Sequence, residues 1–506
     1  MKKLRTMKKF MSLLTIFMML TSFTTFVVAE GSVTLNPGDS IQSAINNIST
    51  EGTITLNNGT YTGNGCNNIV VMNKKITIQS NGDAIIDAKS DGRIFNVANN
   101  SNLTLNNIKL VNGYLNGSTN NGAGIENNGT CTIISSTLSS NYAEYGGAAI
   151  NNNGILTVTN CNISENKAVA KYRAGAGIRN YGECYVSNSI FDHDVGEGDS
   201  SSGGAIMSAG GKKIEVKNSI FTNNRAGYGG AIYTASNSTA ILTNNTFTTN
   251  KADKCGSGLA NYGKCDIADS KFINQVESSQ AVYNAGTMAL NGSNFENNKA
   301  ISGEALYGGA LLNTKECTIT KSNFASNSAD NGGAVSNTGS MNITDSVLNN
   351  NNVSFRGGAV HNSGNMSIKN GVLNNNSILE GNSADNGGAI NNEGGFLNIT
   401  DSLFENNNAN PNNGFYGQHG CGGAIDNFEG NLIVSNSKFI NNHARFGGAI
   451  NSYYAYLNLV NCQIADNIAD YVGGGICSNA GTQDIDSQTM HNFINNSPSD
   501  TFHFYG

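Results

Sequence analysis

The chain has 506 residues, of which 85 are Asn and 61 are Gly, whereas only 3 are Pro and 13% are charged. Because 38% of the residues are apolar, this composition excludes a disordered chain, which is rich in charge and poor in apolar residues. The formal net charge is −7, and it becomes −12 without the five basic residues near the start of the chain. Such a charge excludes the basic surface that nucleic-acid binding needs.

Residues 1–29 have the layout of a secretory signal peptide. A basic segment, 1–10, precedes an apolar segment, and Val28-Ala29 offers the small residues of a cleavage site. An uncleaved membrane anchor is the alternative for this segment. Nothing later resembles a membrane span, so we expect a mature chain without a transmembrane segment, located outside the cell, at the cell surface or in the cell envelope.

Residues 31–121 predict a cap followed by irregular coils. Apolar residues at helical spacing over 39–48 predict a short amphipathic helix, with Asp39 as its N-cap and Gln42 three residues later. This helix would cover the open end of the first coil. Short strands are predicted after it, over 53–56, 69–72, 76–78, 94–97 and 103–105.

A repeat dominates residues 122–496. The phrase Gly-Gly-Ala followed by Ile, Leu or Val, or a variant of it, occurs 14 times at an average spacing of 27 residues. We call the apolar residue that ends the phrase the anchor. The anchors are Ile125, Ile150, Ile178, Ile206, Ile232, Leu259, Val282, Leu311, Val335, Val360, Ile390, Ile425, Ile450 and Ile476.

Each repeat contains further aligned columns. Asn stands two residues after ten of the anchors, as at Asn127 and Asn152, and an apolar column that includes Phe221 and Phe295 often opens a Phe-x-Asn-Asn phrase. Alternation over three to five residues between Asn and Gly indicates short strands and tight bends. One such unit cannot bury its own inner face, but stacked units can, and their Asn residues can then form amide ladders.

The pattern therefore predicts an all-β fold, a single-stranded right-handed parallel β-helix (solenoid) with an N-terminal helical cap. Residues 31–121 form the cap and the first irregular coils, residues 122–496 form the repeated coils, and residues 497–506 form a C-terminal tail.

The 10 Cys residues do not have the spacing of a disulfide framework. Cys131, Cys184, Cys265 and Cys317 share one inward repeat position, and the members of each close pair are separated by two coils, or about 9.6 Å, which is too far for a disulfide. We expect buried, reduced thiols. No Cys-x-x-Cys motif indicates a zinc site.

Few residues are candidates for a site, and we expect no catalytic residue and no cofactor. Four carboxylates are candidates for binding Ca²⁺, with a solvated acidic loop as the alternative: Asp192, Asp194, Glu197 and Asp199. Five residues are candidates for ligand contact through ring stacking or hydrogen bonding: Tyr228, Tyr416, His419, Tyr453 and Tyr454. A plain surface loop is the alternative for the segment 410–421, which contains two of them.

Gly-Gly-Ala-Ile paired with Phe-x-x-Asn resembles the polymorphic outer membrane protein repeat. The first coils, with Gly52-Thr-Ile-Thr-Leu-Asn-Asn-Gly-Thr-Tyr61, look like the opening of β-helix proteins of the pectate-lyase type. As a whole the chain is similar to the adhesin-like right-handed β-helix surface proteins of anaerobic archaea. The resemblance implies display at the cell surface, which is the cell outer membrane in relatives that have one, and a role in adhesion.

These patterns predict a secreted or cell-surface, adhesin-like protein without catalytic activity, whose Asn-rich face contacts a carbohydrate, another cell-surface ligand or the cell envelope. A polysaccharide lyase or glycoside hydrolase of the pectate-lyase-like fold is one alternative, with a site near 192–199 or 410–421. A structural surface-coat protein is the other alternative.

Overall fold

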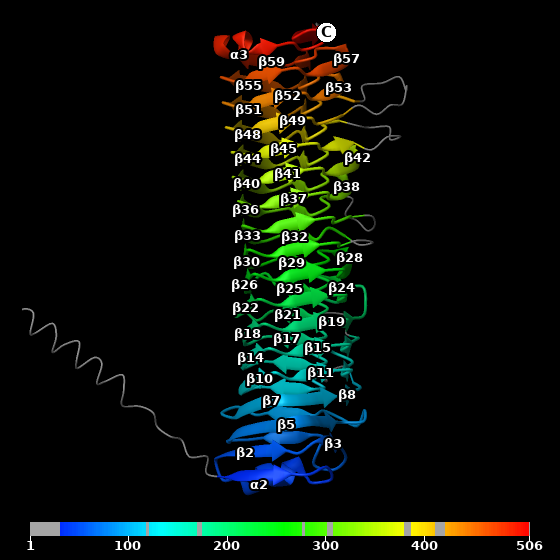
Figure 1. Ribbon diagram of the computed structural model, residues 1–506, viewed down its shortest axis with the longest axis vertical. Coiled ribbons are helices and arrows are strands. Elements are labelled where there is room, and N and C mark those ends of the chain that lie inside the picture. Colours follow the sequence, from blue (N-terminus) through cyan, green and yellow to red (C-terminus); the bar gives the residue numbers. More distant parts are fainter. Residues whose placement is uncertain are drawn as a thin grey trace, which may run out of the picture.

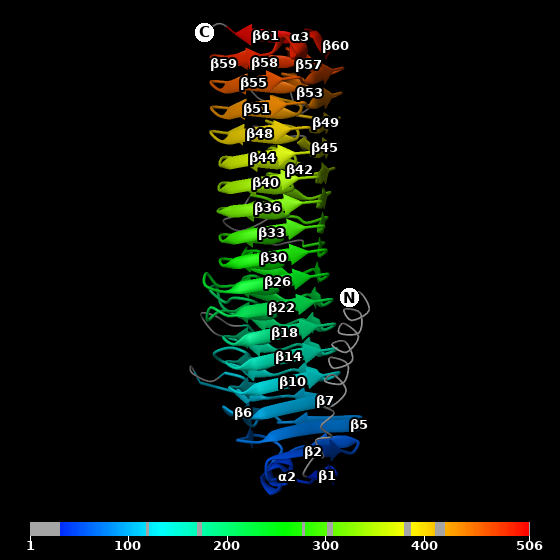
Figure 2. The same ribbon diagram turned by 90° about the vertical axis from the view of Figure 1, so that its left-hand side faces the viewer.

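The computed structural model describes residues 31–117, 121–169, 175–275, 279–300, 307–378, 386–409 and 420–504. The chain winds through about 16 turns into a straight rod (Figure 1), and it has the right-handed parallel β-helix fold that the repeat predicts. The N-terminal helix lies across one end of the rod, and the last strands form the other end (Figure 2).

One sheet contains the strands that begin with the anchors, and we call it the anchor sheet. Its strands are β4 (Ile69–Val71), β6 (Phe95–Val97), β9 (Ile125–Asn127), β13 (Ile150–Asn152), β17 (Ile178–Asn180), β21 (Ile206–Ser208), β25 (Ile232–Thr234), β29 (Leu259–Asn261), β32 (Val282–Asn284), β35 (Leu311–Asn313), β39 (Val335–Asn337), β43 (Val360–Asn362), β47 (Ile390–Glu393), β50 (Ile425–Phe428), β54 (Ile450–Tyr453), β58 (Ile476–Asn479) and β61 (Thr501–Phe504).

A second sheet, the long sheet, receives one long strand or two short ones from each coil. Its strands are β1 (Ser32–Leu35), β2 (Glu51–Leu56), β3 (Gly59–Tyr61), β5 (Lys75–Asp87), β7 (Asn102–Val111), β10 (Thr130–Ile134), β11 (Thr137–Ser139), β14 (Ile155–Thr159), β15 (Asn162–Ser164), β18 (Glu183–Ser187), β19 (Ile190–Asp192), β22 (Lys213–Lys217), β23 (Ile220–Thr222), β26 (Thr239–Thr243), β27 (Thr246–Thr248), β30 (Lys264–Ala268), β31 (Lys271–Ile273), β33 (Thr287–Asn291), β34 (Asn294–Glu296), β36 (Glu316–Thr320), β37 (Asn323–Ala325), β40 (Ser340–Thr344), β41 (Val347–Asn349), β44 (Asn365–Lys369), β45 (Val372–Asn374), β48 (Phe396–Thr400), β49 (Leu403–Glu405), β51 (Asn431–Ser435), β52 (Lys438–Ile440), β55 (Tyr456–Val460), β56 (Gln463–Ala465), β59 (Thr482–Ile485) and β60 (Phe493–Ile494).

Short side strands precede the glycines of many repeats and form three small sheets. They are β8 (Tyr114–Leu115), β12 (Tyr142–Ala143), β16 (Lys167–Ala168), β20 (Val195–Gly196), β24 (Arg225–Tyr228) and β28 (Lys251–Cys255); β38 (Ser328–Asn331), β42 (Asn352–Arg356) and β46 (Ser377–Ile378); and β53 (His443–Phe446) and β57 (Ile468–Val472).

The strand register confirms that equivalent residues of successive repeats lie directly above one another. Ile150 pairs with Ile178, Ile178 with Ile206, and Ile206 with Ile232, all in parallel. Each anchor is fully buried, so the apolar columns of the sequence become continuous stacks inside the rod.

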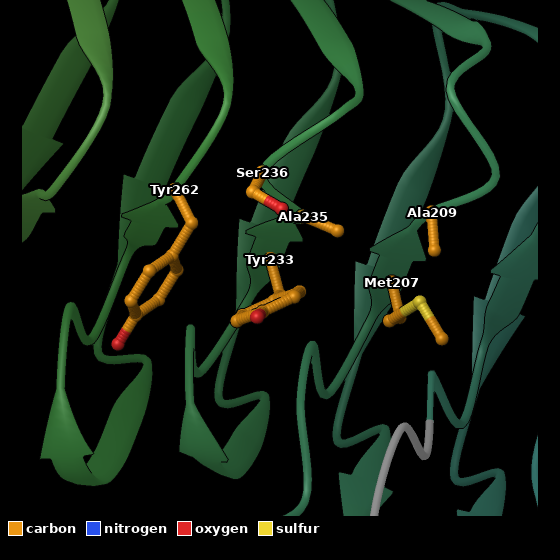
Figure 3. Close-up of a pocket in the computed structure, with 6 residues that line it drawn as sticks. All are labelled: Met207, Ala209, Tyr233, Ala235, Ser236 and Tyr262. Atoms are coloured by element: carbon orange, nitrogen blue, oxygen red, sulfur yellow. The ribbon is translucent and has the colours of Figure 1, made fainter.

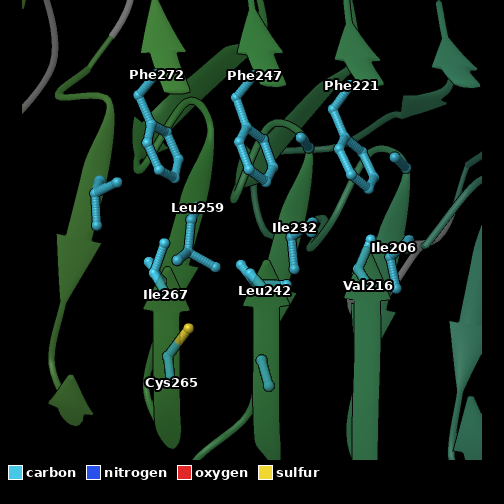
Figure 4. Packing of buried hydrophobic residues seen from close by; sticks show 14 of the residues in the cluster. Ile206, Val216, Phe221, Ile232, Leu242, Phe247, Leu259, Cys265, Ile267 and Phe272 are labelled. Atoms are coloured by element: carbon cyan, nitrogen blue, oxygen red, sulfur yellow. The ribbon is translucent and has the colours of Figure 1, made fainter. Parts of the chain in front are cut away.

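The phenylalanine column forms one of these stacks, made of aromatic rings (Figure 4). From Phe191 to Phe324 the rings of successive coils are nearly parallel, with centroids 4.5–4.9 Å apart. This spacing is that of neighbouring β-strands, so the backbone ladder and the ring stack stabilise each other.

The Asn that follows ten of the anchors by two residues forms a buried amide ladder, as the repeat predicts. The side chain of Asn127 donates to that of Asn152 (2.7 Å), and a second run continues without a break from Asn261 to Asn427. Because these amides are buried, each needs a partner, and the neighbouring coil supplies it.

The predicted helical cap is present as α2 (Ile41–Asn47), but Asp39 is not its N-cap. Ser40 is the N-cap and accepts a hydrogen bond from the Ser43 amide. Asp39 instead accepts from the Asn36 amide, and Gln42 reaches into the next coil to bond both backbone groups of Val70. A partner 28 residues away thus replaces the local capping box.

The C-terminal end of the rod includes two features that no sequence signal indicated. A short helix, α3 (Ser487–His491), begins at Asp486 as its N-cap, and β61 of the tail adds a strand to the anchor sheet beside β58. Within the described residues, neither α2 nor α3 is long or apolar enough to cross a membrane.

All ten Cys residues are buried, and none forms a disulfide. Burial raises the pKa of the Cys131 and Cys184 thiols to about 12. The thiols therefore act as small apolar residues inside the stacks, as the repeat position predicts.

Candidate functional site

The outward face of the anchor sheet changes its chemistry from coil to coil. The residue that directly follows each anchor points away from the interior, and the register aligns these residues into one column. We call this the outward column. It runs from Glu126 through Asn151, Arg179, Met207, Tyr233, Ala260, Tyr283, Leu312, Ser336, His361, Asn391, Asp426 and Asn451 to Cys477.

Much of the outward column is buried, because the glycine after each side strand packs on the outside of the anchor sheet. A side chain on Gly229, for example, would place its Cβ 2.2 Å from the carbonyl oxygen of Ile232. Gly229 also has a φ of +63°, which favours glycine. The glycine pair of the repeat therefore brings the side-strand layer into direct contact with the anchor sheet.

A pocket of about 170 Å³ opens on this face in the middle of the rod (Figure 3). It is lined by Met207, Ala209, Tyr233, Ala235, Ser236 and Tyr262. Three successive coils contribute: the tyrosines project from two of them, and Met207 lies in the coil before. The space exists because the small side chains of Ala209 and Ala235 lie next to the aromatic rings.

The tyrosines of the pocket continue as a tilted row. The ring centroids of Tyr233 and Tyr262 are 5.3 Å apart, and those of Tyr262 and Tyr283 are 5.6 Å apart. Burial raises the pKa of Tyr262 and of Tyr283, so both hydroxyls are neutral at physiological pH. The pocket thus offers aromatic faces and neutral hydroxyls, and no charged side chain is among its lining residues.

A hydrogen-bonded polar row occupies the outward column farther along the rod. His361 Nδ1 lies 2.9 Å from Asn391 Oδ1, and the Asn391 amide donates to Asp426 Oδ2 (3.1 Å). The Asn451 amide donates to the other carboxylate oxygen, Asp426 Oδ1 (2.7 Å). These four residues are consecutive in register, so the row crosses four coils.

The polar row contains two buried titratable groups. Burial raises the pKa of Asp426 to about 7, although both amide donors stabilise its ionised form. Burial also lowers the pKa of His361, whose ring lies 5.7 Å from that of Tyr307. A half-exposed ion pair between Arg356 and Glu393 lies near Asp426 and affects its pKa from the surface side.

The four carboxylates predicted as Ca²⁺ candidates do not converge. Asp194 is fully buried and points inward, whereas Asp192 is half-exposed and lies 2.7 Å from His193. Glu197 forms an ion pair with Lys167 (2.7 Å), and Asp199 is exposed in the following turn. No group of three or more His, Cys, Asp or Glu side chains in the described residues has the geometry of a metal site.

The predicted ligand-contact residues lie in separate places. Tyr228 ends β24 and is half-buried beside Cys255, whose Sγ lies 3.7 Å from the hydroxyl of Tyr262 in the pocket lining. Tyr453 and Tyr454 lie together near the C-terminal end, in an edge-to-face contact with centroids 4.4 Å apart, and Tyr454 is 57% exposed. Tyr416 and His419 lie outside the described residues.

Sequence reasoning missed Tyr233, Tyr262 and the polar row. The available signal was the residue that directly follows each anchor, because it differs from repeat to repeat while the anchors before it stay apolar. Alternation along a strand places such a residue on the outward face. The sequence did not show that this column is partly covered, because the covering residues belong to the side strands.

The comparisons with known proteins agree with the fold. Residues 146–310 match the family model described as a right handed beta helix region. No curated protein matches the chain.

Several solved structures are similar over most of their length. The PL6 family alginate lyase AlyGC is 9% identical with a TM-score of 0.28, covering 94% of this chain and 99% of that one. PfbA, a surface adhesin of Streptococcus pneumoniae, is 12% identical with a TM-score of 0.23, covering 87% of this chain and 85% of that one. The A-module of the mannuronan C-5 epimerase AlgE4 from Azotobacter vinelandii is 12% identical with a TM-score of 0.23, covering 90% and 97%. Likenesses this distant carry no argument about activity.

Proposed function

We propose that the protein is a non-catalytic, adhesin-like β-helix that binds a carbohydrate through the pocket around Tyr233 and Tyr262. The observation that carries this proposal is the pair of tyrosine rings beside a hollow of about 170 Å³ on an otherwise regular surface. Aromatic rings stack on the apolar faces of sugar rings, and tyrosine hydroxyls and Ser236 supply hydrogen bonds at the rim.

The chemistry of the pocket favours a neutral sugar. None of the six lining residues is charged, and the pKa shift of Tyr262 keeps its hydroxyl protonated. The nearest charged residue of the outward column is Arg179, beside Met207 in register. Its guanidinium already donates to Asn151 Oδ1 (3.2 Å) and to the Tyr181 hydroxyl (3.0 Å). An anionic sugar would therefore find no cation among the six residues that line the pocket.

Export and surface display belong to the same proposal. The signal-like residues 1–29 and the resemblance to the polymorphic outer membrane protein repeat support them. A rod of stacked coils would hold the pocket well away from the site of attachment, which suits contact with another surface.

The experiment is a glycan array with the full chain, followed by titration of the best glycan. We expect Tyr233→Ala and Tyr262→Ala to weaken binding by tenfold or more, because each removes a stacking face, whereas Tyr233→Phe retains the ring and most of the affinity. Tyr454→Ala is the matched control, since it removes an exposed ring elsewhere. Loss of binding in Tyr454→Ala but not in the pocket variants would contradict the proposal.

Polysaccharide cleavage is the second candidate function, and one observation favours it. Asp426 has a pKa near 7 and lies in one hydrogen-bonded row with His361, which is how groups that transfer protons at neutral pH are tuned. Release of new reducing ends from a polysaccharide, lost in Asp426→Asn, would support it. No release from any glycan that the protein binds would exclude it.

A further inference from the structure

A second amide ladder, which we call the bend ladder, runs through the interior where the long sheet ends in each coil. Its rungs share one pattern: the backbone amide of each rung donates to the side-chain oxygen of the next. The rungs are Asn141, Asn166, Asp194, Asn224, Asn250, Gln275, Asn298, Asn327, Asn351, Asn376, Asn407, Asn442, Asn467 and Asn496.

The side-chain NH₂ group of a typical rung makes two further hydrogen bonds. In Asn224, Nδ2 donates to the Phe191 carbonyl of the preceding coil (3.0 Å) and to Asn250 Oδ1 of the following coil (2.9 Å). Asn166 does the same, to the Leu138 carbonyl (3.1 Å) and to Asp194 Oδ1 (2.8 Å). Each rung therefore accepts hydrogen bonds from the preceding rung through its side-chain oxygen, and it donates hydrogen bonds to both neighbouring coils through its side-chain NH₂ group.

Asp194 supplies the acceptor but has an oxygen where the other rungs have the donor. Its Oδ1 accepts from both the backbone amide (3.0 Å) and the side chain (2.8 Å) of Asn166. Its Oδ2 is buried and has no hydrogen-bond partner. A Cβ built on Gly177 would lie 3.0 Å from this oxygen, so the side chain is packed against the backbone of the same coil.

The register identifies the groups that the missing donor would serve. Ile163 is the equivalent of Phe191 one coil earlier, so the Ile163 carbonyl corresponds to the acceptor that Asn224 uses. On the other side is Asn224 Oδ1, which already accepts from the Asp194 amide (3.0 Å). Both groups are acceptors. If Asp194 were ionised, its Oδ2 would also be an acceptor, and no hydrogen-bond donor would lie between these three oxygens.

We propose that Asp194 is a neutral carboxylic acid in the folded protein, and that its proton is a structural component of the bend ladder. The O–H of Oδ2 then takes the place of an amide N–H and donates to one of the two acceptors. This satisfies a buried group that otherwise has no partner, at no cost in charge burial.

The charges around the rung act in the same direction. Asp192, in the same bend, and Glu165, one coil earlier, both disfavour a second negative charge, and burial raises the pKa of Asp194 well above its usual range. The cations nearby are engaged elsewhere: Lys167 pairs with Glu197, and Arg225 in the following coil pairs with Asp253.

The proposal makes the stability of the rod depend on pH at one place. The unfolded chain releases the Asp194 proton near pH 4, whereas the folded chain retains it, so this rung loses stability as the pH rises from about 4 towards the folded pKa. Asparagine at this position has the required donor without a proton to lose.

The test compares thermal unfolding of the wild type, Asp194→Asn and the control Asp199→Asn, which changes an exposed carboxylate of the same loop, from pH 4 to pH 9. We expect the midpoint of Asp194→Asn to match the wild type near pH 4 and to exceed it by about 2 °C or more at pH 8, whereas the pH dependence of Asp199→Asn follows that of the wild type. An equal offset of Asp194→Asn from the wild type at every pH would overturn the proposal.

Two further measurements keep the test decisive if Asp194→Asn does not fold. The infrared spectrum of the wild type at pH 8 is expected to contain a protonated-carboxyl band that Asp426→Asn leaves in place, and absence of that band would overturn the proposal. Calcium added to chelator-treated wild type is expected to leave the midpoint unchanged. A calcium-dependent rise would instead assign the buried oxygens to a bound cation.

Discussion

Asp194 in the bend ladder and Asp426 in the polar row are both fully buried aspartates, yet their carboxylate oxygens receive different sets of hydrogen bonds. Each oxygen of Asp426 accepts a hydrogen bond from a different amide, so the ionised form is partly stabilised. Asp194 receives both of its side-chain hydrogen bonds on one oxygen. The comparison shows that the placement of donors, rather than burial alone, decides how a buried acid is used.

The interior and the outward side of the coils also differ in how much they vary. Interior positions repeat from coil to coil and serve stability, whereas the outward column changes from aromatic residues at Tyr233 to polar residues at His361. Substitutions of interior apolar residues should therefore act mainly on stability, whereas substitutions in the outward column should act on glycan binding at Tyr233 and on proton uptake, with its linked change in stability, at Asp426.

The largest expected effect is on the interior side. Phe272→Ala removes a ring that stacks on neighbours at 4.5 and 4.9 Å, and we expect the free energy of unfolding to fall by about 3–5 kcal/mol. Urea unfolding measures this loss. Tyr233→Ala, on the outward column, should cost far less stability while abolishing glycan binding. Equal losses of stability would break the division.

The next effect concerns pH. Since the pKa of Asp426 rises from 3.8 to about 7 on folding, the folded chain holds a proton that the unfolded chain releases, and stability falls by up to about 4 kcal/mol between pH 4 and pH 7. Urea midpoints at pH 4, 5.5, 7 and 8.5 measure the slope. Asp426→Asn should reduce the slope between pH 4 and pH 7 by the contribution of Asp426 and retain the contribution of Asp194, which begins in the same range and continues above it. An unchanged slope would show that Asp426 does not titrate there.

A smaller effect follows from removing one donor of the polar row. Asn451→Ala deletes a hydrogen bond to Asp426 Oδ1, so we expect a loss of about 1–3 kcal/mol at pH 8 and a further rise in the pKa of Asp426. Carbon NMR of labelled aspartate follows that titration. Asn153→Ala, whose side chain is exposed, is the control. A lowered pKa would contradict the assigned donor.

The smallest expected effect is a difference in thiol reactivity between the side strands and the interior of the rod. Burial raises the pKa of every Cys, so a thiol reagent at pH 8 should label the native protein slowly. We expect Cys255, which ends the side strand β28 and is 7% exposed, to react before Cys184, which is fully buried in the interior. Mass spectrometry after timed labelling ranks the sites, and the reverse order would contradict the layering.

Much of the fold could be predicted from the sequence because its signals recur. The anchors, the Asn two residues later and the phenylalanine column all occupy the predicted interior positions. Repetition averages out local ambiguity, since an apolar column that recurs every 27 residues or so has one simple explanation, a stack of equivalent strands.

The candidate site was less predictable, for reasons that particular residues show. Asp192 and Asp194 are only two positions apart in sequence, but Asp192 is half-exposed and Asp194 is fully buried. Carboxylates that are close in sequence therefore do not converge on one site. Tyr233 and Tyr262 are 29 positions apart, yet their rings are 5.3 Å apart. The local sequence predicted Asp39 as the N-cap with Gln42 three residues later. In the structure Ser40 is the N-cap, and Gln42 accepts a hydrogen bond from the Val70 amide.

The sequence by itself determined the winding of the chain, the residues that face inward and the reduced state of its cysteines, because each of these depends on period and spacing within a repeat. Only the tertiary structure decided which outward residues are covered, which carboxylates gain or lack donors, and where a hollow remains between tyrosines. These properties depend on contacts between coils and with the side strands, and no single repeat contains that information.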